Sequence, residues 1–217
     1  MTVKNLRLDL SKAIIERYSS RLVTEDEHLI GALIDLMQRA RSPIHSATTM
    51  IPEIAKLIHR YFEFREVAIA LRDKKDGLYR YKVCIGFRDD AENARYKLAY
   101  TLFDLTDMKT FPGILVRKKT FFHLMENKPF REGEEETYNR PSLLGMERKN
   151  QDEMIEGDYI DSYFYGPNKD PLGWIELSGP RNSKFPSRRT VNWIELTAKI
   201  IAAILIEREL VKKEASR

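Results

Sequence analysis

The stretch that decides the fold of this chain reads Asp158-Tyr-Ile-Asp-Ser-Tyr-Phe-Tyr165, then Gly166-Pro-Asn-Lys-Asp-Pro171, then Leu172-Gly-Trp-Ile-Glu-Leu-Ser178. The outer two segments resemble β-strands, and the segment between them holds residues that are typical of a turn. We therefore predict a β-hairpin. After Lys184-Phe-Pro186, residues 190–213 contain no glycine or proline, which predicts one long closing helix.

The two faces of this hairpin differ in chemistry. If Tyr163 faces Trp174, then Asp161 faces Glu176, because side chains alternate along a strand with a period of two. One face then carries Tyr159, Asp161, Tyr163, Tyr165, Trp174 and Glu176, and the other carries Ile160, Ser162, Phe164, Gly173, Ile175 and Leu177. We expect helices on the second face and a pocket on the first. The alternative is a partly solvated aromatic face whose carboxylates pair with nearby Arg or Lys.

A second hairpin is predicted upstream, where the period changes from helical to extended. Residues 66–72 and 78–87 are rich in strand-forming residues and flank a turn at 73–77. In the second of these strands, alternation places Tyr79, Tyr81, Val83 and Ile85 on one face and Arg80, Lys82 and Cys84 on the other.

Helices are expected before and after the strands. Residues 4–20 show an apolar stripe, Thr24 with Glu27 forms a capping-box pattern for a helix that ends near Ser42-Pro43, and residues 50–62 form a third amphipathic pattern. In the closing helix a wide apolar arc includes Leu196, whereas Glu195 lies opposite it. So wide an arc predicts burial both on the sheet and against another helix, either of this chain or of a partner subunit.

The middle of the chain, residues 88–157, is harder to interpret. We expect a short helix over 89–96, a strand over 97–105, a turn or short helix at Phe111-Pro-Gly113 and a strand over 120–124. Glu134, Glu135 and Glu136 are expected in a solvated loop.

Composition limits the classes of function. The 217 residues carry a net charge of +4 with both signs interleaved, so we expect no nucleic-acid partner. One cysteine, Cys84, excludes an internal disulfide, and the four dispersed histidines lack metal-ligand spacing. The N-terminus lacks a signal-type apolar core, and the longest apolar run, residues 200–206, is far shorter than the roughly 20 residues that span a bilayer. We therefore expect a cytoplasmic protein without a membrane segment.

The order of these elements resembles a GAF domain over about residues 44–207. The resemblance depends on Val67-Ala-Ile-Ala-Leu-Arg-Asp73, on Phe111-Pro-Gly-Ile-Leu-Val116 and, above all, on the terminal hairpin and closing helix. It implies an α+β fold with a central antiparallel sheet, terminal helices on one face and a pocket under a variable lid on the other. The expected organisation is an N-terminal helical segment, 1–43, followed by a GAF-like domain, 44–213.

The resemblance and the hairpin together imply a site for a small molecule. Its candidate residues are Asp161, Tyr163, Trp174, Glu176, Tyr81 and His123, and its carboxylates favour cationic or hydroxyl-rich groups. No cofactor is identified. Cys84 is interpreted as a small core residue rather than a chromophore anchor of the kind found in some bilin-binding GAF domains.

No catalytic motif is recognisable, so we expect a ligand-sensing module that acts through a partner protein and forms a homodimer through its terminal helices. The alternative is a non-catalytic dimerisation or scaffold module whose pocket is degenerate.

Overall fold

The computed structural model describes residue 12, residues 24–41 and residues 47–215. The predicted helix over 4–20 lies outside them, apart from the helical Lys12. The chain divides into two compact units, Met1–Asp35 and Leu36–Arg217. None of the described helices combines the length and apolar character needed to cross a membrane.

Helix α2, Glu25–Arg41, begins at the predicted capping box. The Thr24 backbone N–H donates to Glu27 Oε2 over 2.7 Å, and the Glu27 N–H donates to Thr24 Oγ1 over 3.2 Å. These two bonds satisfy N–H groups that the first turn of a helix leaves free. The predicted start of this helix is therefore confirmed.

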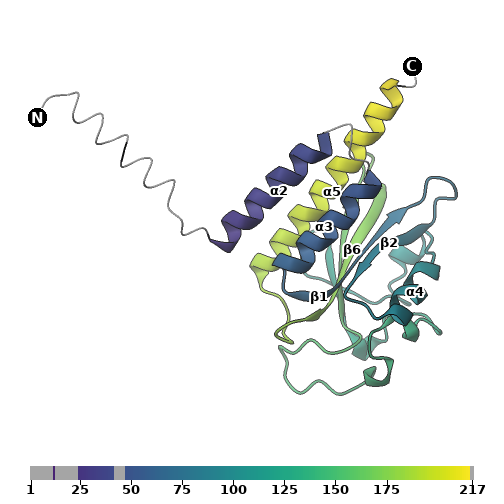
Figure 1. Cartoon of the computed structure of the whole chain (residues 1–217). Helices are drawn as coiled ribbons and strands as arrows, with labels where there is room; N and C mark the ends of the chain where they lie inside the picture. Colours follow the sequence, from purple (N-terminus) through teal and green to yellow (C-terminus); the bar gives the residue numbers. More distant parts are fainter. Residues whose placement is uncertain (1–11, 13–23, 42–46, 216–217) are drawn as a thin grey trace, which may run out of the picture. The chain divides into compact units, whose positions relative to one another are not determined.

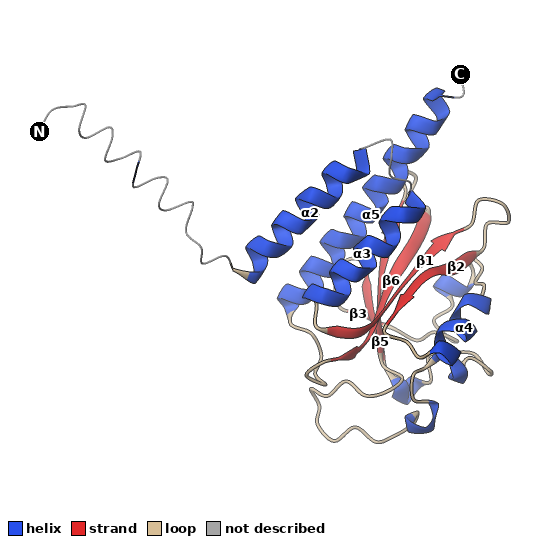
Figure 2. Cartoon of the chain, viewed as in Figure 1, coloured by secondary structure: helices blue, strands red, loops and turns tan. Residues whose placement is uncertain are grey.

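The second unit is built on a six-stranded antiparallel sheet of order β2-β1-β6-β5-β4-β3 (Figure 2). Its strands are β1 Phe64–Arg72, β2 Tyr79–Ile85, β3 Ile114–Leu115, β4 Thr120–His123, β5 Tyr159–Tyr165 and β6 Pro171–Pro180. Together with the helices this is the α+β arrangement that the sequence predicted.

Helices α3, Ala47–Tyr61, and α5, Arg188–Ala215, pack on one face of this sheet (Figure 1). The side chains on that face are fully buried in the described chain: Val67, Ile69, Ile160, Ile175 and Leu177. Helix α4, Asp89–Lys97, and the segments around it lie on the opposite side (Figure 1). The predicted sidedness of the terminal hairpin is confirmed.

The register of that hairpin also agrees with the prediction at its centre. Tyr163 lies opposite Trp174, and Asp161 lies opposite Glu176. A register shift between Phe164 and Tyr165 alters only the end near the turn.

The predicted alternation along β2 is wrong beyond Tyr81. Ala70 pairs with Tyr81 and Ile69 pairs with Val83, so one extra residue, Lys82, is accommodated in a β-bulge. Because paired residues share a face, Cys84 lies with Tyr81 on the pocket side, and Val83 lies with Ile69 under the helices.

Two positions of α5 also differ from the prediction. Glu195, expected opposite the buried arc, is buried, and its carboxylate accepts hydrogen bonds from the Lys119 backbone N–H and from Thr120 Oγ1 at the start of β4. Leu196, expected on the buried arc, is 42% exposed. The predicted apolar arc therefore contains an exposed leucine.

The middle segment contains α4 and β4 as predicted, but the strand expected over 97–105 is wrong. Only Tyr100 makes a strand-like pair there, with Tyr79, and a short 3-10 turn, Asp104–Thr106 (η1), follows. Glu134, expected in solvent, is buried, because it accepts the backbone N–H of Arg131 and lies 3.8 Å from that guanidinium group.

Candidate functional site

A cavity of about 40 Å³ lies on the pocket side of the sheet. We call it the central cavity, and we call residues 100–113, which cover it, the lid. The sheet contributes Tyr81, Tyr159, Asp161, Tyr163, Trp174 and Glu176, and the lid contributes Tyr100, Asp104, Leu105 and Phe111. This volume holds about one small polar group, whereas ligand pockets of proteins typically measure about 300–1,000 Å³.

The structure brings the six predicted site residues together. Five of them line the central cavity: Tyr81, Asp161, Tyr163, Trp174 and Glu176. His123 does not line it but lies directly behind Asp161, with its Nε2 atom 3.6 Å from Asp161 Oδ2.

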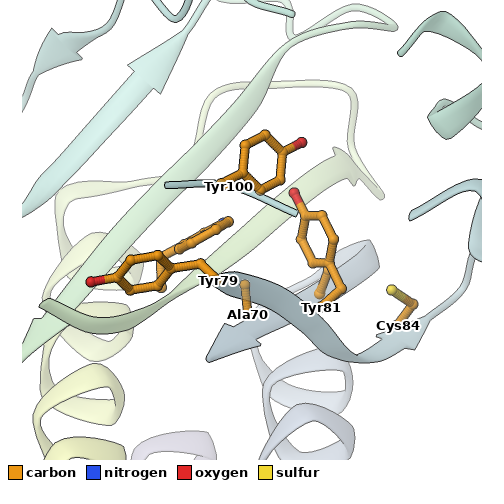
Figure 3. Packing of buried hydrophobic residues seen from close by; sticks show 7 residues of the cluster. Ala70, Tyr79, Tyr81, Cys84 and Tyr100 are labelled. Atoms are coloured by element: carbon orange, nitrogen blue, oxygen red, sulfur yellow. The ribbon is translucent and has the colours of Figure 1, made fainter. Parts of the chain in front are cut away.

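Aromatic rings form much of the wall. Trp174 packs at steep angles against Tyr81 and Tyr100, with ring centroids 5.8 and 5.7 Å apart and an interplanar angle of 76° in both pairs. Tyr81 and Tyr100 are themselves nearly perpendicular, at 86°. Figure 3 shows the rings of Tyr79, Tyr81 and Tyr100 gathered beside strand β2. The rings of Tyr81, Tyr100 and Trp174, at steep angles to one another, thus enclose one corner of the cavity.

The Glu176 carboxylate is fully engaged. Its Oε1 accepts a hydrogen bond from Arg95 Nη1 over 2.5 Å, and its Oε2 accepts one from the Tyr81 hydroxyl. Arg95 also donates to the Thr137 carbonyl over 3.0 Å, and its guanidinium carbon lies 4.2 Å from the centroid of the Phe87 ring. Arg95 and Glu176 are both buried and form an ion pair within the wall.

Arg95 is not among the predicted site residues, although the sequence carries a signal for it. Ala91 and Arg95 stand four residues apart and share the buried face of α4. The helix is otherwise strongly polar. An arginine on the same face as the alanine therefore indicates that this arginine has a buried partner.

Asp161 is the carboxylate without such compensation. Burial first, and then the Glu176 carboxylate directly opposite it, raise the pKa of Asp161 well above its usual range, and Arg95 and the Tyr163 hydroxyl offset this only in part. The Asp161 Oδ1 atom is buried and has no hydrogen-bond partner among the described residues. The same holds for the Nε1 atom of Trp174.

His123 cannot supply the missing charge. Its Nδ1 atom lies 3.1 Å from the Pro112 carbonyl, which can only accept, so Nδ1 carries the ring hydrogen and Nε2 presents a lone pair. Burial lowers the pKa of His123 to about 4, so the ring is neutral near pH 7. The contact between Nε2 and Asp161 is therefore not an ion pair at that pH.

The lid is fastened by Arg131, which is also not among the predicted site residues. Its guanidinium group lies 2.5 Å from Asp104 Oδ1 and stacks over the rings of Tyr100 and Phe111, 5.0 and 5.5 Å from their centroids. One side chain therefore contacts both ends of the lid and its centre.

Cys84 is an inert neighbour of the cavity wall. It is buried, and burial raises the pKa of its thiol to about 12. A thiol with so high a pKa is a poor nucleophile at neutral pH.

Two larger surface hollows do not share these features. One, of about 580 Å³, lies beside α4, and one of about 450 Å³ lies between β5 and α5. Within the part of the chain that the structure describes, their walls contain no buried polar side-chain atom that lacks a partner. Among the side chains that the structure describes, no group of three or more His, Cys, Asp and Glu is placed to hold a metal ion. The central cavity is therefore the candidate site.

No protein-family model matches the sequence, and no curated protein matches it. Solved structures with a similar fold include a GAF domain/HD domain protein from Geobacter sulfurreducens, with a TM-score of 0.54 and 10% identity over 76% of this chain and 95% of that one. The GAF domain of a protein assigned as a sensor histidine kinase from Pseudomonas syringae pv. tomato gives 0.52 and 11% over 98% and 99%. The A. aeolicus nlh2 GAF domain in an inactive state gives 0.54 and 12% over 85% and 99%.

Identities this low are informative about the fold alone. The six-stranded antiparallel sheet with its helices, together with TM-scores above 0.5 to these GAF domains, shows that this chain has the GAF fold.

Proposed function

We propose that this chain is a non-catalytic sensory module, which binds a small molecule in the central cavity and transmits the binding event to a partner protein. The observation that carries this proposal is the pair of buried atoms without partners, Asp161 Oδ1 and Trp174 Nε1, both in residues that line the cavity. Each such atom costs about 1–3 kcal/mol of stability, which a ligand could return. The fold shared with a protein assigned as a sensor histidine kinase also supports a sensory function.

Binding of a whole metabolite requires the lid to move, because the cavity of about 40 Å³ accepts only one small group. The Arg131–Asp104 pair that fastens the lid is partly exposed, with 35% and 20% of the two side chains accessible. Ion pairs in such positions contribute little, about 0–1 kcal/mol. This ion pair is therefore a weak fastening of the lid.

A chain of contacts leads from the site to α5. Strand β4 carries His123 at one end and Thr120 at the other, and Thr120 Oγ1 donates to the buried Glu195 of α5 over 3.1 Å. The Lys119 backbone N–H and Arg117 Nε donate to the same carboxylate over 3.1 and 2.9 Å. A displacement of β4 would thus act directly on the long helix, which supports α5 as the output element.

A thermal-shift screen of a metabolite library tests the proposal. We expect at least one compound to stabilise the unmodified protein and the exposed-site control Asp90→Ala, but neither Trp174→Ala nor Asp161→Ala. If no compound stabilises the protein, or if both cavity variants keep the response, the central cavity is not the sensing site.

The small volume favours a second candidate function, a dimerisation or scaffold module whose pocket is degenerate. In that case Tyr81, Tyr100 and Trp174 simply fill the site. The two functions differ in the lid-release variant Arg131→Ala, which strengthens binding of any compound found in the screen if the cavity is a true site. A scaffold module gains no affinity for small molecules from that change.

A further inference from the structure

We infer that the group recognised in the central cavity is a primary ammonium group, carried by a small amine that also offers a hydrogen-bond acceptor to Trp174. This inference rests on the proposed function, since it names the chemical class of the small molecule that the cavity would bind.

The charges around the cavity favour a cationic ligand. Of the two buried carboxylates in the cavity wall, Glu176 is paired with Arg95 over 2.5 Å. The nearest basic group to Asp161 is His123, which is neutral near pH 7. Arg131, which fastens the lid from outside it, is engaged with Asp104 over 2.5 Å. The cavity therefore offers one ionisable carboxylate without a paired cation, and a cationic ligand would supply what is missing.

Hydrogen bonding at the cavity wall favours a ligand with N–H donors. The Asp161 Oδ1 atom, in a residue that lines the cavity, is a buried acceptor without a donor among the described residues. A primary ammonium group brings three N–H donors, whereas a quaternary ammonium group brings none. The unpartnered acceptor thus favours a primary amine over a trimethylated one.

The shape of the cavity also suits an ammonium group. Tyr81, Tyr100 and Trp174 line the cavity at steep mutual angles, an arrangement suited to a cation that contacts ring faces. The volume of about 40 Å³ is close to that of a single water-sized group. An ammonium head group fits without rearrangement of the wall, and the rest of the molecule would extend towards the lid.

The acceptor on the ligand follows from Trp174. Its Nε1–H is a buried donor without a partner among the described residues, Trp174 lines the cavity, and it is a diagonal neighbour of Asp161 on the adjacent strand. Such neighbours are about 7 Å apart at their Cα atoms. A hydroxyl, carbonyl or carboxylate oxygen a few bonds from the nitrogen could therefore reach Trp174 while the ammonium group contacts Asp161.

Nuclear magnetic resonance of the tryptophan side chains provides the test, because the chain contains only Trp174 and Trp193. The variant Trp193→Phe assigns the two indole N–H signals. The probes are ethanolamine, which has an ammonium and a hydroxyl group, its trimethylated form choline, and uncharged ethylene glycol. We expect ethanolamine to shift the Trp174 signal with saturable, millimolar affinity, which is reasonable for a probe of so few atoms. Choline and ethylene glycol should bind at least tenfold more weakly.

The variant Asp161→Asn preserves shape and removes the charge, so ethanolamine affinity should fall at least tenfold there and stay unchanged in the control Asp90→Asn. Equal binding of choline or ethylene glycol, or full binding by Asp161→Asn, overturns the inference and leaves the proposed function intact. The inference alone also fails if ethanolamine does not bind while the library screen yields another compound that depends on Asp161 and Trp174. If neither experiment finds a ligand, both proposals are wrong.

Discussion

Asp161 couples the site to the stability of the protein. Because the pKa of Asp161 is raised in the folded state, its carboxyl group stays protonated there over a pH range in which the unfolded chain has lost that proton. Stability is therefore lost as pH rises above about 4, the ordinary pKa of aspartate, and the loss is complete above the folded-state pKa.

We predict that Asp161→Asn stabilises the free protein at neutral pH. The amide carries no charge to desolvate, and its NH₂ group can donate towards the lone pair on His123 Nε2. The expected gain is about 1 kcal/mol, or about 2–4 °C in melting temperature, and it should vanish below pH 4 or so. Thermal unfolding across pH checks this, and a variant less stable than the parent at pH 7 would contradict it.

Gly173, on the helix-covered face of the sheet, allows strands β1 and β6 to approach closely. A Cβ atom at this position would lie 2.0 Å from the Ala70 carbonyl oxygen and 2.8 Å from the Phe164 ring. We predict that Gly173→Ala costs about 3 kcal/mol of unfolding free energy, because backbone cannot yield as a flexible side chain can. Denaturant unfolding measures the loss.

The matched control for this change is Gly31→Ala. A Cβ atom there meets nothing within 4 Å, and the position lies inside α2. Alanine should gain up to about 1 kcal/mol at such a helical site. Equal effects at the two positions would show that the close approach at Gly173 is unimportant.

At the scale of elements, the lid and its fastening are the part most open to change. We predict that Arg131→Ala accelerates hydrogen exchange of the backbone amides in residues 100–113, because the variant loses the contacts with Asp104, Tyr100 and Phe111. Global stability should fall by less than about 1 kcal/mol.

The control is Lys184→Ala, which removes an exposed ion pair with Asp152 over 2.7 Å, far along the chain from the lid. Its lid amides should exchange as in the parent. Unchanged lid exchange in Arg131→Ala would mean that other contacts hold the lid closed.

The strands also show which features of the fold could be predicted from the sequence. Strict alternation fixed the faces of β5 and β6, because both strands are regular where Asp161 meets Glu176 and Tyr163 meets Trp174. Alternation failed along β2, because a β-bulge at Lys82 reverses which side chains face the pocket beyond it. The residue types around Lys82 do not indicate a bulge.

The site was predicted only as far as local patterns reach. Its sheet residues follow from alternation, and His123 was suggested by its strand-like surroundings. Arg95 and Arg131 act through partners 81 and 27 residues away, a separation that no periodicity encodes. The burial of Glu195 likewise depends on three donors from another segment.

At the scale of the whole molecule, we predict a homodimer through α5. Leu196 is 42% exposed on a helix that is otherwise apolar over a wide arc, and a second copy could cover it. Light scattering should report twice the monomer mass, and Leu196→Asp should shift it towards the monomer. Leu102→Asp, at a leucine of the lid that is 54% exposed, is the matched control. A monomeric parent at micromolar concentration would contradict the prediction.

The two unpartnered atoms of the central cavity also set the strength of the signal that the molecule could send. Satisfying both would release about 2–6 kcal/mol. A ligand shifts an equilibrium between two states only by the difference in its affinity for them. The lower value changes the ratio of states roughly thirty-fold, and the upper value suffices to reverse a 1:99 population. A partner protein that responds to this module must therefore have two states whose free energies differ by no more than a few kcal/mol.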